Sequence, residues 1–138
     1  MNRILFILGG SGQIGQETCK KLSNEFNLIV VLDLKKPSIE NKKVIFEKFD
    51  CSNFKVIESN IKNLIKKYGT PHTFINCSYP ASKDWPNCSF KKIKIKYLVE
   101  NLNSHLISYC WTSKIIADAM KKKNKKSSII LISSIYGF

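Results

Sequence analysis

The stretch that decides the fold is GGSGQIG, residues 9–15, in which Gly9, Gly12 and Gly15 recur at every third position. The apolar run RILFIL, residues 3–8, precedes it, and a helical pattern of apolar residues follows it. A chain that turns sharply from a buried strand into a helix needs residues without a Cβ, both for the turn and for close packing. The helix start then offers free N–H groups and a positive dipole end to an anion. This context favours a phosphate-binding turn over a simple glycine turn.

Apolar runs and helical patterns alternate along the rest of the chain. The runs predicted to be strands are residues 3–8, 28–33, 44–46, 73–76 and 128–133, and the predicted helices are 13–26, a stretch that starts at Ser52 and stops at Gly69, and 93–120. Apolar strands that alternate with helices are typical of a parallel sheet covered on both faces. We therefore predict an α/β fold, with residues 1–138 as a single domain.

Composition narrows the class of protein. The chain has 138 residues with 43% hydrophobic content, which is enough for one domain with a core. It contains no apolar stretch of the length that a membrane span requires, and its N-terminus lacks the cleavage site of a signal peptide. The five cysteines form no CxxC pair and the two histidines stand at no ligand spacing to them, so we predict no metal site. Scattered thiols suggest a reducing, cytoplasmic location.

The net charge of +13 raises the alternative of a nucleic-acid binder. However, the basic residues are spread along the chain, and their dense cluster, KKKNKK at 121–126, falls between a helix pattern and a strand pattern. A solvated loop is expected there. We interpret the charge as a compositional bias towards lysine and predict neither a nucleic-acid nor a membrane partner.

Asp33 strengthens the interpretation of the glycine turn. It ends the second predicted strand, 21 residues after Gly12. A carboxylate there can accept hydrogen bonds from ribose hydroxyls and would repel a 2′-phosphate, which favours NAD over NADP. Lys35 and Lys36 follow closely and could soften that preference. The alternative is an ordinary polar residue at a strand end.

Across its whole length the sequence resembles the short-chain dehydrogenase/reductase family. GGSGQIG is like that family's first βα turn, FDCSN (49–53) is like the end of its third strand, and INCSYP (75–80) resembles its NNAG motif, with Tyr79 and Pro80 in place of the glycine. The resemblance implies a Rossmann-type doubly wound sheet with strand order 3-2-1-4-5. It also implies that the residues at the cofactor are Gly9, Ser11, Gly12, Gln13, Ile14, Gly15, Asp33, Asp50, Cys51, Asn76, Cys77 and Ser78.

The resemblance implies two catalytic residues. ISSIYG (132–137) is similar to the end of the family's fifth strand, where Ser134 matches the catalytic serine by its spacing to Gly137. In the long helix, His105 takes the place of an asparagine that holds a proton-relay water in the family, whereas Asn103 lies on a different face. The alternative for His105 is a satisfied, partly buried histidine.

The family's Tyr-x-x-x-Lys pair does not follow Ser134, because the sequence stops four residues later, and Tyr136 has no lysine at the fourth position after it. We therefore expect an N-terminal part of a longer enzyme, truncated after the fifth strand and inactive alone. An exposed apolar stripe is expected on the long helix and at the fifth strand, through which the full-length form would be a homo-oligomer. The YP and SSIYG segments are similar to members of the family found in flagellin-glycan and nonulosonate biosynthesis.

The function that the resemblance implies is NAD(P)-dependent hydride transfer to or from a carbonyl or alcohol of a small molecule, with a sugar or sugar nucleotide as a candidate. Two alternatives remain open besides the nucleic-acid binder. The GxxGxxG spacing also fits an extended-type sugar-nucleotide epimerase or dehydratase of the same family. A non-catalytic dinucleotide-binding module is the other.

Overall fold

The structure is a computed structural model that describes residues 3–80, 89–123 and 126–133 of the chain. Its elements are β1 (Ile4–Leu8), α1 (Gln13–Leu22), β2 (Leu28–Asp33), β3 (Val44–Lys48), α2 (Ile57–Tyr68), β4 (Thr73–Asn76), α3 (Ile95–Lys122) and β5 (Ser128–Leu131). All neighbouring strands pair in parallel, in the order β3-β2-β1-β4-β5. This is the predicted Rossmann-type order.

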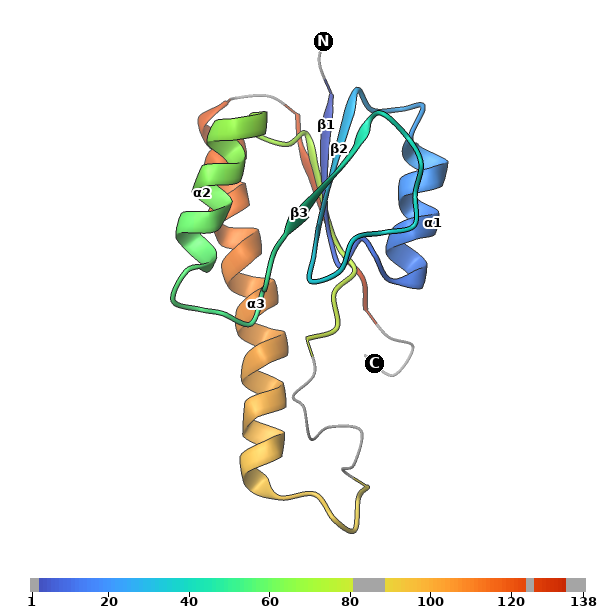
Figure 1. Ribbon diagram of the computed structural model, residues 1–138. Coiled ribbons are helices and arrows are strands. Elements are labelled where there is room, and N and C mark those ends of the chain that lie inside the picture. The colour runs from blue at the N-terminus through green and yellow to red at the C-terminus, as the bar shows by residue number, and fades with distance from the viewer. Residues whose placement is uncertain (1–2, 81–88, 124–125, 134–138) are drawn as a thin grey trace.

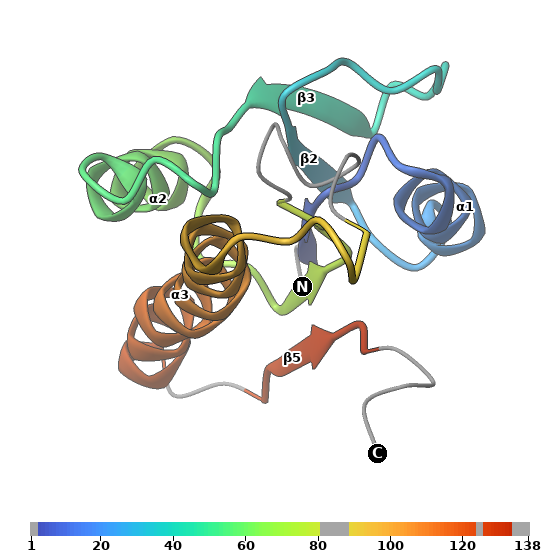
Figure 2. The ribbon, with the colours of Figure 1, turned by 90° about the horizontal axis from the view of Figure 1, so that it is seen from below.

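The sheet separates two layers of helices: α1 covers one face, and α2 and α3 cover the other (Figures 1 and 2). Alternate residues of each strand supply the two cores, as the period of a strand requires. On the α1 side the core is Leu5, Ile7, Cys19, Phe26, Ile29, Val31 and Ile75, and the α2 and α3 side is centred on Phe6, Leu8, Val30, Leu32, Phe74, Ile57, Ile61 and Ile116. Burial on both faces explains why the central strands β1 and β2 are almost entirely apolar.

Several predicted boundaries differ from the structure by a few residues, and two of these differences have a clear local reason. α1 ends at Leu22 because the Ser23 side chain donates a hydrogen bond to the Lys20 carbonyl and a turn follows. α2 begins at Ile57 rather than at Ser52, because Asp50 accepts hydrogen bonds from the Ser52 amide and hydroxyl and holds that segment in turns. β3 continues to residue 48, and β5 ends at residue 131.

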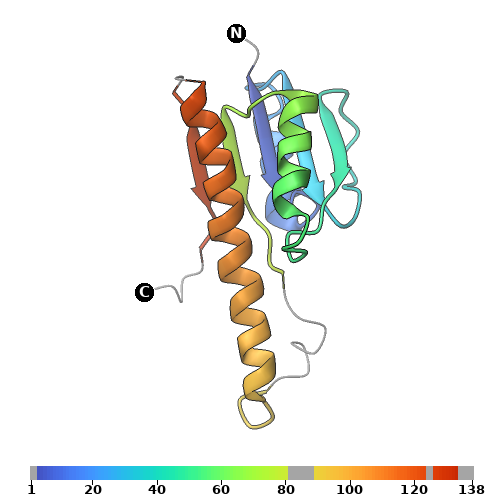
Figure 3. The same cartoon turned by 90° about the vertical axis from the view of Figure 1, so that its left-hand side faces the viewer.

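α3 runs beside the sheet, and its N-terminal half extends past the carboxyl ends of the strands (Figures 1 and 3). That half exposes an apolar stripe formed by Ile95, Val99, Leu102 and Leu106, which are 46 to 75% exposed. β5 similarly exposes Ile130 and Leu131. The predicted exposure of the long helix and of the fifth strand is therefore confirmed. Although α3 has 28 residues, no helix in the described ranges is long and apolar enough to cross a membrane.

Gly15 is where α1 packs against the turn that precedes it. A Cβ at this position would lie 2.4 Å from the Gly9 carbonyl oxygen and 2.5 Å from the Gly10 Cα. Because both contacts are with backbone, relief requires α1 to move, so we expect Gly15→Ala to lower the free energy of unfolding by about 2 kcal/mol. Urea denaturation measures this, with Gly12→Ala as the matched control, since a Cβ there lies 3.5 Å from the nearest atom. Equal midpoints for Gly15→Ala and the unsubstituted protein would contradict the packing argument.

Candidate cofactor-binding site

The carboxyl ends of the strands bring three loops of the predicted site together. The chain moves from β1 to β2 on one side and later returns to β4 on the other side of β1, so the loops after β1 and β4 diverge. Such a reversal of strand order leaves a crevice at the carboxyl edge of an open parallel sheet. Backbone hydrogen bonds anchor both loops, from the Gly9 amide to the Leu32 carbonyl and from the Cys77 amide to the Leu8 carbonyl.

The turn between β1 and α1 lies directly against the loop after β4. Gly9 has φ of +73°, and a Cβ at this residue would lie 2.6 Å from the backbone of Ser78. α1 then begins with Gly12 as its N-cap, without a side-chain cap and without an acidic residue in its first turn. The first amides of a helix have no partner within the helix, so this terminus can donate hydrogen bonds to an anion.

Side chains connect this turn to the end of β2. The Ser11 amide donates to Asp33 Oδ2 at 2.9 Å, and the Ser11 hydroxyl donates to the Lys35 carbonyl. Gln16 acts as a brace, since its Nε2 donates to the Ser11 carbonyl at 2.9 Å and its Oε1 accepts from the Ser38 amide at 3.2 Å. Sequence reasoning missed Gln16, whose two partners lie in other segments of the chain.

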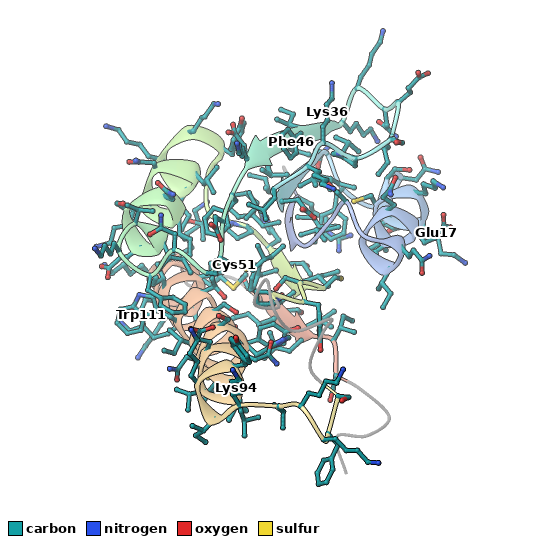
Figure 4. The ribbon with its side chains drawn as sticks, turned by 60° about the horizontal axis from the view of Figure 1, so that its bottom comes forward. Glu17, Lys36, Phe46, Cys51, Lys94 and Trp111 are labelled. Atoms are coloured by element: carbon teal, nitrogen blue, oxygen red, sulfur yellow. The ribbon has the colours of Figure 1, made fainter. Side chains whose placement is uncertain are left out.

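A cleft of about 460 Å³ lies at this edge and is called the outer pocket here. Its lining includes eight of the residues predicted at the cofactor: Gly9, Ser11, Gly12, Asp33, Asp50, Cys51, Cys77 and Ser78. Lys35, Phe49 and Tyr79 also line it. Seen from this edge, Cys51 lies near the middle of the molecule, whereas Lys36 and Glu17 lie at its periphery (Figure 4). The outer pocket thus combines a helix N-terminus with two carboxylates.

The loop after β4 is held by Asn76, which is fully buried. Its Oδ1 accepts hydrogen bonds from the Ser78 amide at 3.0 Å and from the Ser78 hydroxyl at 2.7 Å. From α3, the Tyr109 hydroxyl donates to the Ser78 carbonyl. Asn76 therefore shapes the loop from below and does not line the outer pocket.

A second cavity of about 360 Å³, called the inner pocket here, adjoins the outer pocket, because Cys77, Ser78 and Tyr79 line both. Its other lining residues are Ile14, His105, Tyr109, Ile132 and Ser133. The His105 ring meets the Tyr79 ring edge-on, with centroids 4.4 Å apart. Sequence reasoning missed this contact and the role of Tyr109, although Tyr109 follows His105 by one helical turn.

Burial changes the acidity of the side chains in both pockets. Loss of solvent raises the pKa of the Cys51 and Cys77 thiols, so they stay neutral at physiological pH. It raises the pKa of the Tyr109 hydroxyl for the same reason. Burial lowers the pKa of His105, so its imidazole is neutral at pH 7.

Three of the described residues predicted at the cofactor, Asn76, Gln13 and Gly15, line neither pocket. Gln13 is exposed at the start of α1, and Gly15 is buried beneath the turn. Ser134 lies outside the described residues. A further groove of about 440 Å³ runs between α2 and α3 and is lined by lysines together with Glu58 and Asp118. None of the predicted cofactor residues contributes to it.

Comparison with known proteins places this geometry in a family. The model of the short chain dehydrogenase family matches residues 3–138. Post-translational flagellin modification protein A of Campylobacter coli is 28% identical over 99% of this chain and 57% of its own length. A Leptospira borgpetersenii short chain dehydrogenase with bound NAD⁺ has a TM-score of 0.83 at 26% identity, over 99% of this chain and 53% of that one.

A likeness of fold alone extends to the aldohexose dehydrogenase of Thermoplasma acidophilum, with a TM-score of 0.79 at 20% identity, over 96% of this chain and 49% of that one. The chain spans about half the length of these relatives. The match to the family model covers nearly all of the chain, including each strand of the sheet and the glycine turn. The chain belongs to the short chain dehydrogenase family.

Proposed function

We propose that the chain binds NAD, in preference to NADP, as the cofactor-binding part of an oxidoreductase that acts on an alcohol or carbonyl of a small molecule. The observation that supports this most directly is the outer pocket, where the uncapped start of α1 and the Asp33 carboxylate face one space. In a dinucleotide bound to a βαβ unit, the diphosphate rests on the start of the helix and the ribose on a carboxylate at the end of the second strand.

The residues present fit a dinucleotide laid across the carboxyl edge. The diphosphate would rest on the first amides of α1 beside Gly12, and Asp33 would accept hydrogen bonds from the adenosine ribose. Asp50 and Cys51 would border the adenine, and the second nucleotide would extend over β4 into the inner pocket. When bound, NAD supplies the site that accepts or donates a hydride.

The proton chemistry is a further part of this proposal. Ser134 would polarise and orient the substrate oxygen, and a tyrosine with a lowered pKa beside a lysine would move the proton. No Tyr-x-x-x-Lys follows Ser134 in the sequence, so we propose that these 138 residues bind cofactor without turnover. As the substrate class we propose a sugar or sugar nucleotide, which is what the resemblance of the YP and SSIYG segments to family members of flagellin-glycan biosynthesis implies. Four cysteines of the described residues are free thiols, which is consistent with a cytoplasmic location.

Titration of the protein with NADH tests the proposal. Saturable quenching of tryptophan emission, with energy transfer to the bound NADH, is expected and should be reversed by NAD⁺. Turnover of sugar or sugar-nucleotide substrates in addition to binding would contradict the proposed lack of activity in these residues. Binding without turnover is expected both for the cofactor-binding part of an oxidoreductase and for a non-catalytic dinucleotide-binding module. A folded protein that shows no NADH binding would overturn the assignment.

We also propose that the full-length protein is a homo-oligomer that buries the apolar stripe of α3. Water contact along four large apolar side chains is unfavourable, and a second copy of α3 would offer a matching face. The double substitution Leu102→Lys and Leu106→Lys should therefore convert an oligomer into a monomer in sedimentation velocity. Val56→Lys, at an exposed position off the stripe, is the control. A monomeric unsubstituted protein at high concentration would refute this proposal.

A further inference from the structure

The inner pocket receives the nicotinamide end of the cofactor if the proposed function holds, and the following inference rests on that function. Asp33 and Asp50 place the adenosine over β2 and β3, so the other nucleotide must extend towards β4 and β5. The inner pocket is the cavity next to the outer pocket in that direction, since Cys77, Ser78 and Tyr79 line both.

The described residues that line the inner pocket include no carboxylate, lysine or arginine. Among the described lining residues, the titratable groups around His105 are Cys77 and Tyr79 from the loop after β4 and Tyr109 from its own helix. The segments of α1 and of the chain after β5 contribute Ile14, Ile132 and Ser133. Burial raises the pKa of Cys77 and of Tyr109, so both stay neutral at and below pH 7. Among the described residues that line the inner pocket, none supplies an anion that would neutralise an imidazolium at His105.

His105 packs against two aromatic rings in this pocket, and one of its ring nitrogens makes no hydrogen bond. The edge of one ring meets the face of the other in its contact with Tyr79, at an interplanar angle of 65°, and the Tyr109 ring lies 6.4 Å away between centroids. Its Nε2 is buried and has no hydrogen-bond partner. Tyr79 and His105 also stand where the family resemblance expects a glycine and an asparagine, so two departures from the family pattern contact each other.

We propose that His105 makes the site discriminate between reduced and oxidised cofactor, increasingly so as the pH falls, and that Tyr79 is the positioning residue that holds its ring. The nicotinamide ring of NAD⁺ carries a positive charge and that of NADH does not. A protonated His105 therefore repels the oxidised ring, whereas the diphosphate is common to both cofactors. Since burial lowers the pKa of His105, this discrimination is absent at pH 8 and develops below pH 6.5.

The ratio of the dissociation constants of NAD⁺ and NADH is the quantity to measure, by NADH fluorescence and by NAD⁺ competition from pH 8 to pH 5. For two unit charges in a partly buried site, the ratio is expected to rise by about tenfold. In His105→Asn it should stay constant. His72→Asn is the matched control, because His72 is the other histidine and accepts a hydrogen bond from the Ile4 amide, distant from both pockets.

The positioning role of Tyr79 is tested by measuring the pKa of the His105 imidazole in Tyr79 variants. Removing the ring in Tyr79→Leu should expose His105 and return its pKa towards 6.5, as measured by ¹⁵N NMR. The pH at which the ratio of dissociation constants changes should then rise. Tyr79→Phe keeps the ring and should leave the pKa of His105 and that pH unchanged. A constant ratio in the unsubstituted protein overturns the inference while the proposed function stands. Failure to bind either cofactor at pH 8 overturns the proposed function. Circular dichroism establishes that each variant is folded, and His105→Gln replaces His105→Asn if the latter is not.

Discussion

Replacing Gly12 with alanine is expected to raise the dissociation constant for NADH by about 100-fold without lowering the stability of the protein. Gly12 is the exposed N-cap of α1 with φ of −73°, a conformation that alanine adopts readily. Its Cβ would meet no protein atom closer than 3.5 Å and would occupy space beside the first amides of the helix. A diphosphate kept away from these amides loses charge-assisted hydrogen bonds of about 1.5–3 kcal/mol each.

The comparison needs both a binding and a stability measurement. Thr18→Ala, also on α1, removes a hydroxyl that donates to the Ile14 carbonyl away from the cleft and should leave NADH affinity unchanged. If Gly12→Ala binds NADH as tightly as the unsubstituted protein, the diphosphate does not rest on the start of α1. If Gly12→Ala unfolds at a lower urea concentration, a weakened affinity is no longer informative about the ligand.

Much of the fold could be predicted because the sheet is buried on both faces. β1 is buried at every residue, and β2 and β4 are nearly so, which makes their runs of apolar residues easy to recognise. The start of α2 was mispredicted because Ser52 is a good helix N-cap by type, yet its amide and hydroxyl both bond to Asp50. Local hydrogen bonding to an upstream carboxylate outweighed the propensity of the residue.

The candidate site also has parts that the sequence predicts and parts that it does not. The positions of the glycine turn and of Asp33 at strand ends could be read from the residues, whereas Asp50 came from the family resemblance. Their lining of one pocket follows from parallel strands sharing an edge, and their contact with a cofactor stays a prediction. The edge contact of Tyr79 with His105 could not, since it joins a loop to a helix across residues whose separation has no periodic meaning. The brace made by Gln16 was likewise hidden, because a polar residue on an exposed helix face carries no signal of its tertiary partner.

Replacing Asp33 with serine is expected to lower the ratio of the dissociation constants of NADPH and NADH by about 100-fold. The carboxylate lines the outer pocket, with Oδ2 bonded to the Ser11 amide and Oδ1 to the Leu34 amide. In this position it favours ribose hydroxyls and repels a 2′-phosphate, and each contribution is about 1–2 kcal/mol in a partly solvated cleft. Serine removes the negative charge, while Lys35 remains in the lining to attract the phosphate.

Asp50→Ser separates this effect from a general loss of affinity. Asp50 also contributes a carboxylate to the outer pocket, but from the loop after β3, where the adenine rather than the ribose would lie. Its replacement should change the affinities for NADH and NADPH by the same factor, leaving their ratio constant. A preference of the unsubstituted protein for NADPH would show that Lys35 and Lys36 outweigh Asp33. The Asp33 side chain also anchors the glycine turn, so its loss could weaken the binding of both cofactors. If NADPH affinity rises in Asp33→Ser at least as much as NADH affinity falls, the change in the ratio comes from the lost negative charge and not from loosening of that turn.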